Sequence, residues 1–373
     1  MSASRWRALI LNERDPKHPK AGGAEVHVAE IFSRLAARGH EVVQASSSFP
    51  GAPEQEKVDG IEVWRLGALP VYYPRALWTC ARTTRAGRFD VVVECLNKLP
   101  FLSPLYARVP VLGLCHHLFG EAAFLQVSWP VATTVYAVEK LVPRVFRNAR
   151  FAVISESTRD DLAARGVDPS HIEVHHPGIR WPAQPALPLP ARARRITYVG
   201  RLERYKNVDV LLRALAKLLP RFPDAELAVV GQGADRVRLE RLADELGVAS
   251  QVRFTGFLDD AARDLLLASS RVCACASAKE GWGLTVIESN ALGTPNVASD
   301  APGLRDSVRH GETGFLVPVG DVDGFTDRIG ALFADDALAS RMSEAAVAFA
   351  RRFDWDHAAD QMEAALFLAL RDR

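Results

Sequence analysis

The feature that most constrains this chain is a regular alternation of short apolar runs with amphipathic stretches, which continues along almost all of its 373 residues. One amphipathic stretch spans residues 25–38 and ends at Gly39, directly before the next apolar run, as expected for a helix with a C-terminal glycine. Its apolar residues, spaced as on one helix face, are Val26, Ala29, Phe32, Leu35 and Ala36. Strands that alternate with helices predict parallel sheets covered by helices on both faces. The expected strands lie at 8–12, 41–45, 61–66, 90–95, 111–115, 151–154 and 172–175, and then at 196–199, 227–230, 252–254, 272–276, 296–298 and 315–317.

The alternation is interrupted once, by residues 181–195, where four prolines fall within ten residues. Such a segment forms a stiff, extended connector. A chain of 373 residues is also too long for one ordinary core. We therefore predict an α/β fold of two Rossmann-like, doubly wound domains at 1–180 and 196–350, with a linker at 181–195 and a helical segment at 351–373. In such sheets ligands bind at the carboxyl ends of the strands, so the expected site is the crevice between the two domains.

Composition narrows the class of protein further. The net charge is +1, so no global field attracts nucleic acid, and none is expected as a partner. The five cysteines contain no C-x-x-C pair and fall in apolar runs, which is typical of reduced thiols in a cytoplasmic protein. The uncharged stretch 122–138 contains Pro130 and is shorter than the roughly 20 residues of a membrane span, so we expect no transmembrane helix. The N-terminal apolar run is short and is followed by charges, which favours a first strand over a signal peptide.

Two glycine-containing turns that follow apolar runs carry most of the candidate site. In SAKEGWGLTVIE, backbone N–H groups at the predicted helix start can bind an anion. Glu280 and Glu288 are eight positions apart, so we expect them to bracket a ligand rather than touch each other. In YVGRLERYK, Arg201 and Lys206 follow a strand and suit a diphosphate. The alternative interpretation is a glycine turn with solvated carboxylates and surface cations.

Three further patterns are less specific. VVGQGAD, with Gly231 and Gly233, contains half of a dinucleotide-binding fingerprint. KAGGAE places two glycines just before a helix, where they could contact a phosphate or a sugar. His116 and His117 directly follow the strand VLGLC, and a histidine there can hydrogen-bond a substrate hydroxyl or transfer a proton. We expect one of the two to face the ligand and the other to pack away from it.

Taken in order, GRLERYKNVDVLLRAL, VVGQGAD, RFTGFLDD, SAKEGWGLTVIESNALGTPNVASDAPGLRDSV and GETGFLVPVGD resemble retaining GT-B glycosyltransferases of family GT4. The resemblance covers nearly the whole chain and is strongest from about residue 195 to 320. It implies transfer of a sugar from a nucleotide-sugar donor, with retention at the anomeric carbon and without a metal or other cofactor. One departure is Trp282, where the family more often has phenylalanine.

The resemblance also implies a role for each matching residue. These roles are binding of the donor diphosphate by Arg201 and Lys206, contact with the transferred sugar by Glu280, ribose binding by Glu288, backbone contacts to phosphates or sugar from Gly283, Leu284 and Thr285, further donor contacts at Gly22, Gly23, Gly231 and Gly233, and the active-site histidine at His116, with His117 as the alternative. The expected catalytic set is His116, Glu280, Arg201 and Lys206.

The acceptor is suggested only by the segment from Tyr72 to Arg88, which has four arginines and no acidic residue. On a helix, Arg75, Trp78 and Arg82 would share one face with Arg85, and a basic aromatic stripe suits anionic lipid. An ordinary solvated helix face is the alternative. We therefore expect a cytoplasmic enzyme with peripheral contact at the inner face of the cell membrane and a cell-envelope glycan or lipid-linked acceptor, or else a small soluble one. The rival functions are a sugar-nucleotide epimerase, a phosphorylase, or a pseudoenzyme that binds a nucleotide-sugar.

Overall fold

The computed structural model describes residues 5–96, 99–120, 128–183, 187–189 and 192–371. They form two compact units. Unit 1 consists of Met1–Gly178 together with Asp354–Arg373, and unit 2 is Ile179–Phe353. The chain therefore leaves unit 1 once, builds unit 2, and then returns to unit 1.

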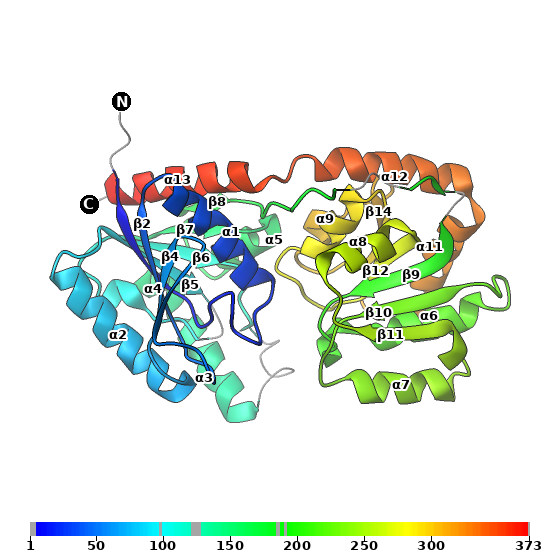
Figure 1. The fold of residues 1–373 in the computed structure, drawn as a ribbon, viewed down its shortest axis with the longest axis horizontal. Coiled ribbons are helices and arrows are strands. Elements are labelled where there is room, and N and C mark those ends of the chain that lie inside the picture. The colour runs from blue at the N-terminus through cyan, green and yellow to red at the C-terminus, as the bar shows by residue number, and fades with distance from the viewer. Residues whose placement is uncertain (1–4, 97–98, 121–127, 184–186, 190–191, 372–373) are drawn as a thin grey trace. The chain divides into compact units, whose positions relative to one another are not determined.

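Unit 1 is built on an eight-stranded sheet whose order is β3-β4-β2-β1-β5-β6-β7-β8 (Figure 1). The strands are β1 (Arg7–Leu11), β2 (Glu41–Ser46), β3 (Gln55–Val58), β4 (Ile61–Arg65), β5 (Val91–Leu96), β6 (Val111–Cys115), β7 (Arg150–Val153) and β8 (Ile172–Val174). Neighbouring strands are parallel except β3, which pairs with β4 in the antiparallel direction. The sequence did not predict β3. Asp59 and Gly60 both have positive φ and form the tight turn of this hairpin, so the Asp-Gly pair was the signal for it.

Helices cover both faces of this sheet, which confirms the predicted α/β class. One face packs against α1 (Gly23–Ala37) and α13 (Trp355–Arg371), and the other against α2 (Leu69–Arg85), α4 (Val142–Val145) and α5 (Glu156–Ala164). The short 3-10 turn Ser103–Leu105 follows β5, and α3 (Trp129–Glu139) precedes α4. Arg38, the C-cap residue of α1, also forms ion pairs with Asp360 and Glu363 of α13, each at 2.7 Å.

The buried face of α1 matches the predicted one in part, since Phe32 and Leu35 are buried as expected but Val26 is not. Val26 is 45% exposed, whereas His27 and Glu25 are buried together with the apolar Val28 and Ile31. The apolar spacing missed part of this face because two polar residues, Glu25 and His27, occupy inward positions of the helix.

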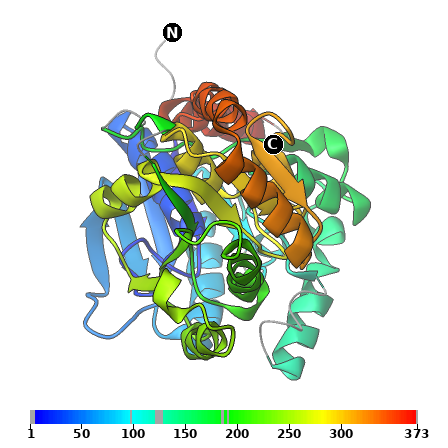
Figure 2. The same cartoon turned by 90° about the vertical axis from the view of Figure 1, so that its right-hand side faces the viewer.

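Unit 2 contains a fully parallel six-stranded sheet whose order is β11-β10-β9-β12-β13-β14. Its strands are β9 (Ala193–Val199), β10 (Glu226–Val230), β11 (Val252–Gly256), β12 (Ser270–Cys275), β13 (Asn296–Ser299) and β14 (Gly314–Val317). Figure 2 looks toward this unit and shows helices on both sides of its sheet. One face packs against α6 (Val208–Leu218), α7 (Arg236–Glu245) and α11 (Val322–Ala334), and the other against α8 (Asp260–Ala268), α9 (Leu284–Ala291) and α10 (Leu304–Ser307). The long helix α12 (Asp336–Ala350) packs against α9.

Two segments discussed from the sequence lie partly outside the described residues. Residues 122–127 of the uncharged stretch lie outside them, and the remainder of that stretch enters α3. Within the segment assigned to the linker, residues 184–186 and 190–191 also lie outside them, and β9 already begins at Ala193. None of the helices in the described part of the chain is long and apolar enough to cross a membrane.

Candidate functional site

The N-terminus of α9 lies at the carboxyl edge of the unit 2 sheet. Gly283 caps the helix with φ +99°, and a Cβ added there would lie 2.8 Å from Ser307 Oγ, so this position requires glycine. The amides of Leu284 and Thr285 precede the first amide that bonds back to Gly283. Helix-start amides of this kind attract anions.

Lys206 and Glu280 form an ion pair beside this helix start. Lys206 closes the 3-10 turn Arg204–Lys206 after β9, and its Nζ lies 2.5 Å from Glu280 Oε1, with the two side chains only 12% and 19% exposed. Burial is the largest single effect on the pKa of Lys206 and lowers it, but the charge and hydrogen bond of Glu280, together with smaller effects of Tyr205 and Cys275, outweigh burial in sum, so the pKa of Lys206 is raised overall. The lysine is therefore a cation at neutral pH, and an incoming phosphate would compete with Glu280 for it.

Loops from three neighbouring strands fix the backbone around Glu280. The Ala278 N–H donates to Tyr205 O at 2.9 Å, and the Glu280 N–H donates to Pro302 O at 3.2 Å. Gly303 has φ +81°, and a Cβ there would lie 2.5 Å from Glu280 O. The carboxylate therefore stands on a braced loop, as a preorganised contact for a ligand requires.

Arg201 differs from Lys206 because it holds no acidic partner among the described residues. Its side chain is exposed, and its Nη2 contacts Tyr205 Oη at 3.4 Å. Its backbone is held in place, since Tyr198 Oη donates to Arg201 O at 2.8 Å. The guanidinium is thus a positioned cation that remains available to an anion.

Glu288 lies on α9, away from the Lys206–Glu280 pair. Its Oε1 is 3.6 Å from Nη1 of Arg263 on α8. Burial raises the pKa of Glu288, and the charge of Arg263 opposes that rise. Glu280 and Glu288 therefore hold different cations. Sequence reasoning missed Arg263, which does not directly follow a glycine turn and stands between Asp260 and Asp264.

Gly231 and Gly233 allow two loops of unit 2 to lie in contact. A Cβ at Gly231 would come within 1.9 Å of Gly200 O, and one at Gly233 within 2.2 Å of Leu202 O. The two loops also exchange a hydrogen bond from Leu202 N–H to Gln232 O at 2.9 Å. These glycines have a packing role that braces the loop carrying Arg201, and their predicted donor contact remains a prediction.

In unit 1, Gly22 and Gly23 begin α1 as the sequence indicated. Gly22 caps the helix in an extended conformation, and its N–H donates to Glu25 Oε2 at 2.7 Å. The GGAE motif is therefore a local capping arrangement around a buried carboxylate.

His116 at the end of β6 points into the interior of unit 1. It is 6% exposed, and its Nε2 lies 3.1 Å from Nδ1 of His27, which is also buried. Burial lowers the pKa of His116 to about 3 and holds that of His27 well below its usual range. Both rings are therefore neutral at physiological pH. The neighbouring His117 is partly exposed, and its ring lies 4.9 Å from that of Phe119.

Metal ligands and reactive thiols are the other functional groups to consider among the described residues. No cluster of three or more His, Cys, Asp or Glu side chains is placed to hold a metal ion within the residues that the structure describes. All five cysteines are free thiols, and burial raises the pKa of Cys275 to about 11, so it is not a ready nucleophile.

Comparison with known proteins gives a consistent family. The family described as Glycosyl transferases group 1 matches residues 180–349, and the one described as Glycosyltransferase Family 4 matches residues 21–180. The chain is 31% identical to the D-inositol 3-phosphate glycosyltransferase of Mycolicibacterium paratuberculosis, over 94% of this chain and 87% of that protein. It is 30% identical to the phosphatidyl-myo-inositol mannosyltransferase of Mycobacterium leprae, over 91% of each.

Solved structures agree on the fold. Sucrose-phosphate synthase of Thermosynechococcus elongatus superposes with a TM-score of 0.82 at 24% identity, over 99% of this chain and 100% of that one. Anabaena HepE, solved with UDP-glucose, superposes with a TM-score of 0.77 at 19% identity, over 97% of this chain and 99% of that one. The matched families and the near-full-length relatives show that this chain belongs to glycosyltransferase family 4, and is a glycosyltransferase of GT-B fold.

Proposed function

We propose that unit 2 binds a nucleoside-diphosphate sugar at the N-terminus of α9, and that the enzyme transfers the sugar with retention of configuration. The observation that carries this proposal is the exposed Arg201, which lacks an acidic partner in the described part of the chain and stands on the same loop as Lys206. Two cations and the helix-start amides would share the charge that develops on the departing diphosphate.

Within this site, each carboxylate has a separate task. Glu280 would contact the transferred sugar once the diphosphate has drawn Lys206 away from it. Glu288 would accept hydrogen bonds from the ribose hydroxyls, because Arg263 helps to keep it ionised despite its burial. No metal is needed in this scheme, because protein cations and the helix start neutralise the leaving group.

A thermal-shift screen in EDTA with UDP, GDP, ADP and dTDP tests the donor site. A ligand present at 100 times its Kd adds about 2.7 kcal/mol of stability, which raises Tm by several degrees. One nucleotide should do so, and Arg201→Gln and Lys206→Met should abolish the shift. Arg213→Gln removes the same charge from an exposed position on α6 and should keep it. A shift that needs added Mg²⁺, or that survives Arg201→Gln, would contradict the assignment.

We further propose that the acceptor carries a phosphorylated cyclic polyol or is a related lipid-linked or envelope glycan. Two relatives support this, since one is named a D-inositol 3-phosphate glycosyltransferase and the other a phosphatidyl-myo-inositol mannosyltransferase. Incubating the enzyme with a donor and either acceptor, followed by NMR of the new anomeric centre, tests both the acceptor class and retention.

We also propose that the enzyme is cytoplasmic and makes a peripheral contact with an anionic membrane through the outward face of α2. Its buried stripe includes Ala76 and Cys80, and the opposite face carries Arg75, Trp78, Arg82 and Arg85, with Trp78 being 59% exposed. The helix contains no acidic residue, and none of these three arginines makes an ion pair within the described residues.

Sedimentation with vesicles tests this contact. Binding to phosphatidylglycerol vesicles should exceed binding to phosphatidylcholine vesicles and should weaken with salt. It should also weaken in the double variant Arg82→Gln/Arg85→Gln. Arg147→Gln, at an exposed position elsewhere in unit 1, is the matched control. Equal binding to both lipids would refute the contact.

A further inference from the structure

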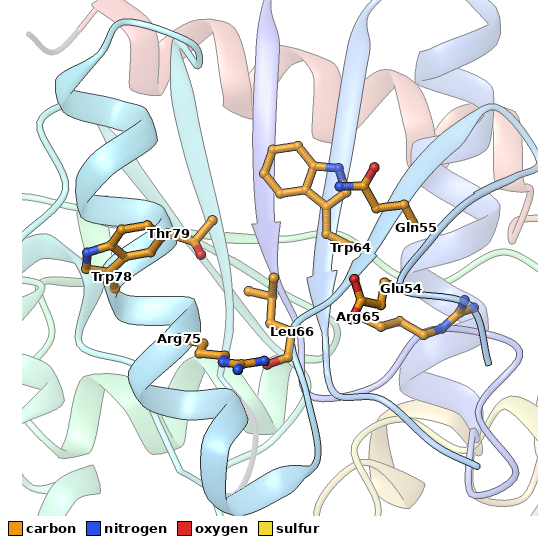
Figure 3. A pocket seen from close by; sticks show the side chains of 8 residues that line it. All are labelled: Glu54, Gln55, Trp64, Arg65, Leu66, Arg75, Trp78 and Thr79. Carbon is orange, nitrogen blue, oxygen red and sulfur yellow. The ribbon is translucent and has the colours of Figure 1, made fainter. Parts of the chain in front are cut away.

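A pocket lies wholly within unit 1, between α2 and the β3–β4 hairpin. Its volume is about 340 Å³, within the range of small-molecule sites. It is lined by Glu54, Gln55, Trp64, Arg65, Leu66, Arg75, Trp78 and Thr79. Figure 3 shows Trp78 and Thr79 on α2, Trp64 and Gln55 across from them on the hairpin, and the Arg75 side chain reaching from α2 toward Leu66.

The two arginines of this pocket differ in their availability to a ligand. Arg65 is fully buried and is held by Asp15 at 2.9 Å and by Glu56 at 3.1 Å, so its charge is already neutralised. Arg75 is exposed, forms no ion pair among the described residues, and donates a long hydrogen bond of 3.5 Å to Leu66 O. The pocket therefore offers one guanidinium with unused donors, in the geometry that suits a phosphate or carboxylate.

The rest of the lining suits a hydroxylated ring. Trp64 already donates its Nε1–H to Glu62 Oε1 at 2.7 Å, so it presents apolar ring surface to the pocket rather than a hydrogen bond. Trp78 supplies a second, largely exposed indole. Glu54, Gln55 and Thr79 add a carboxylate, an amide and a hydroxyl, which are partners for ring hydroxyls. Aromatic surface with a few polar groups is the usual design of a small-molecule site.

We infer that this pocket binds a sugar or cyclic polyol that carries an anionic group, with the anion on Arg75 and the ring beside Trp64 and Trp78. This inference rests on the proposed function, because such a ring would belong to the acceptor. The ring phosphate can come from a free sugar phosphate or from a lipid head group, and the pocket chemistry is the same for both.

The test uses the full chain and two kinds of probe. Glucose 6-phosphate is titrated calorimetrically, with glucose and inorganic phosphate as partial ligands, and vesicles of phosphatidylinositol are compared with vesicles of phosphatidylglycerol. We expect glucose 6-phosphate to bind more tightly than either partial ligand, or phosphatidylinositol vesicles to bind more tightly than phosphatidylglycerol vesicles. The first result identifies a soluble ring phosphate and the second a lipid head group.

Variants distinguish binding in the pocket from binding at the outward face of α2. Arg75→Gln and Thr79→Val should each weaken ring-phosphate binding, Arg75→Gln by at least about tenfold, which is 1.4 kcal/mol. Thr79 lines the pocket but lies off the outward face, so Thr79→Val should leave phosphatidylglycerol binding unchanged. Arg85→Gln should do the reverse, since Arg85 lies on the outward face but outside the pocket.

Several results would overturn the pocket. One is that neither glucose 6-phosphate nor phosphatidylinositol vesicles bind. Another is that glucose 6-phosphate binds no tighter than inorganic phosphate and phosphatidylinositol vesicles bind no tighter than phosphatidylglycerol vesicles. The third is that wild type and Arg75→Gln bind the ring phosphate equally. The thermal shift with nucleotides is measured on the same preparations. A normal nucleotide shift with no ring-phosphate binding would reject the pocket alone, whereas loss of both would reject the proposed function as well.

Discussion

Acidification is expected to destabilise unit 1 through the buried pair of His27 and His116. Burial, with a smaller effect of His117, lowers the pKa of His116 from its ordinary 6.5 to about 3. The folded pKa lies below the unfolded one, so between the two the unfolded chain binds a proton that the folded chain does not. The contribution of neutral His116 to the free energy of unfolding is therefore fully present above about pH 6.5 and is lost as the pH falls toward 3.

The size of the loss follows from the two pKa values of His116. At pH 5.5, protonation stabilises an unfolded histidine by about 1.4 kcal/mol relative to pH 7.5, whereas folded His116 gains almost nothing. The geometry explains why the folded protein disfavours protonation of His116. With one nitrogen of each ring shared at 3.1 Å, His116 Nδ1 and His27 Nε2 are buried without a hydrogen-bond partner among the described residues.

The assay is urea unfolding read by hydrogen–deuterium exchange in peptides from α1 and β6, so that the free energy belongs to unit 1. Between pH 7.5 and 5.5, the free energy of unfolding of the wild type should fall by about 1.4 kcal/mol more than that of His116→Gln, because the unfolded variant has no histidine to protonate at position 116. His171→Gln removes a partly exposed histidine from the same unit and should keep the wild-type loss. Equal losses in wild type and His116→Gln would show that folded His116 accepts the proton, and would refute the reasoning.

Three further outcomes are expected. Arg201→Ala should lower kcat at least about 100-fold, which corresponds to about 2.7 kcal/mol of transition-state stabilisation, with Tm unchanged. Arg263→Met should raise the donor KM and move the acidic limb of kcat/KM to higher pH, because Glu288 loses the charge that opposes its raised pKa. Gly231→Ala should cost about 3 kcal/mol in urea unfolding, since φ is +131° and the Cβ would meet Gly200 O at 1.9 Å.

Matched controls accompany these three variants. Arg213→Ala should keep full kcat, and near-normal kcat in Arg201→Ala would remove Arg201 from the mechanism. Arg241→Met on α7 should leave the pH profile in place, and an unmoved profile in Arg263→Met would show that Glu288 is held ionised by other groups. Gly51 has φ +80° but an empty Cβ position, so a cost for Gly231→Ala no larger than that for Gly51→Ala would rule out the clash.

The central strands were predictable for a physical reason. A parallel strand buried on both faces must be apolar along its length, and runs such as VVVECL of β5 show this directly. The edge strand β3, with the sequence QEKV, lacks that signature because it is charged and largely exposed, and only its Asp-Gly turn marks it.

Residues of the candidate site could be named from the sequence where they cluster, and not where they depend on long-range partners. Arg201, Lys206 and Glu280 stand close to glycine turns, and those turns made them candidates. Arg263 meets Glu288 from another helix, 25 positions away, and His27 meets His116 across 89 positions. Spacing along the chain cannot report such pairs, since the topology of the sheet alone brings them together.

The return of α13 to unit 1 sets an order for biosynthesis. The core beneath α1 includes Trp355, Met362 and Leu366, so its apolar surface stays open until residues 355–371 have been synthesised. Unit 2 is complete once Phe353 has been added. Most of unit 1 is therefore synthesised before unit 2 but is completed after it. While unit 2 folds, the apolar surfaces of β1, β5 and α1 remain uncovered and can bind chaperones.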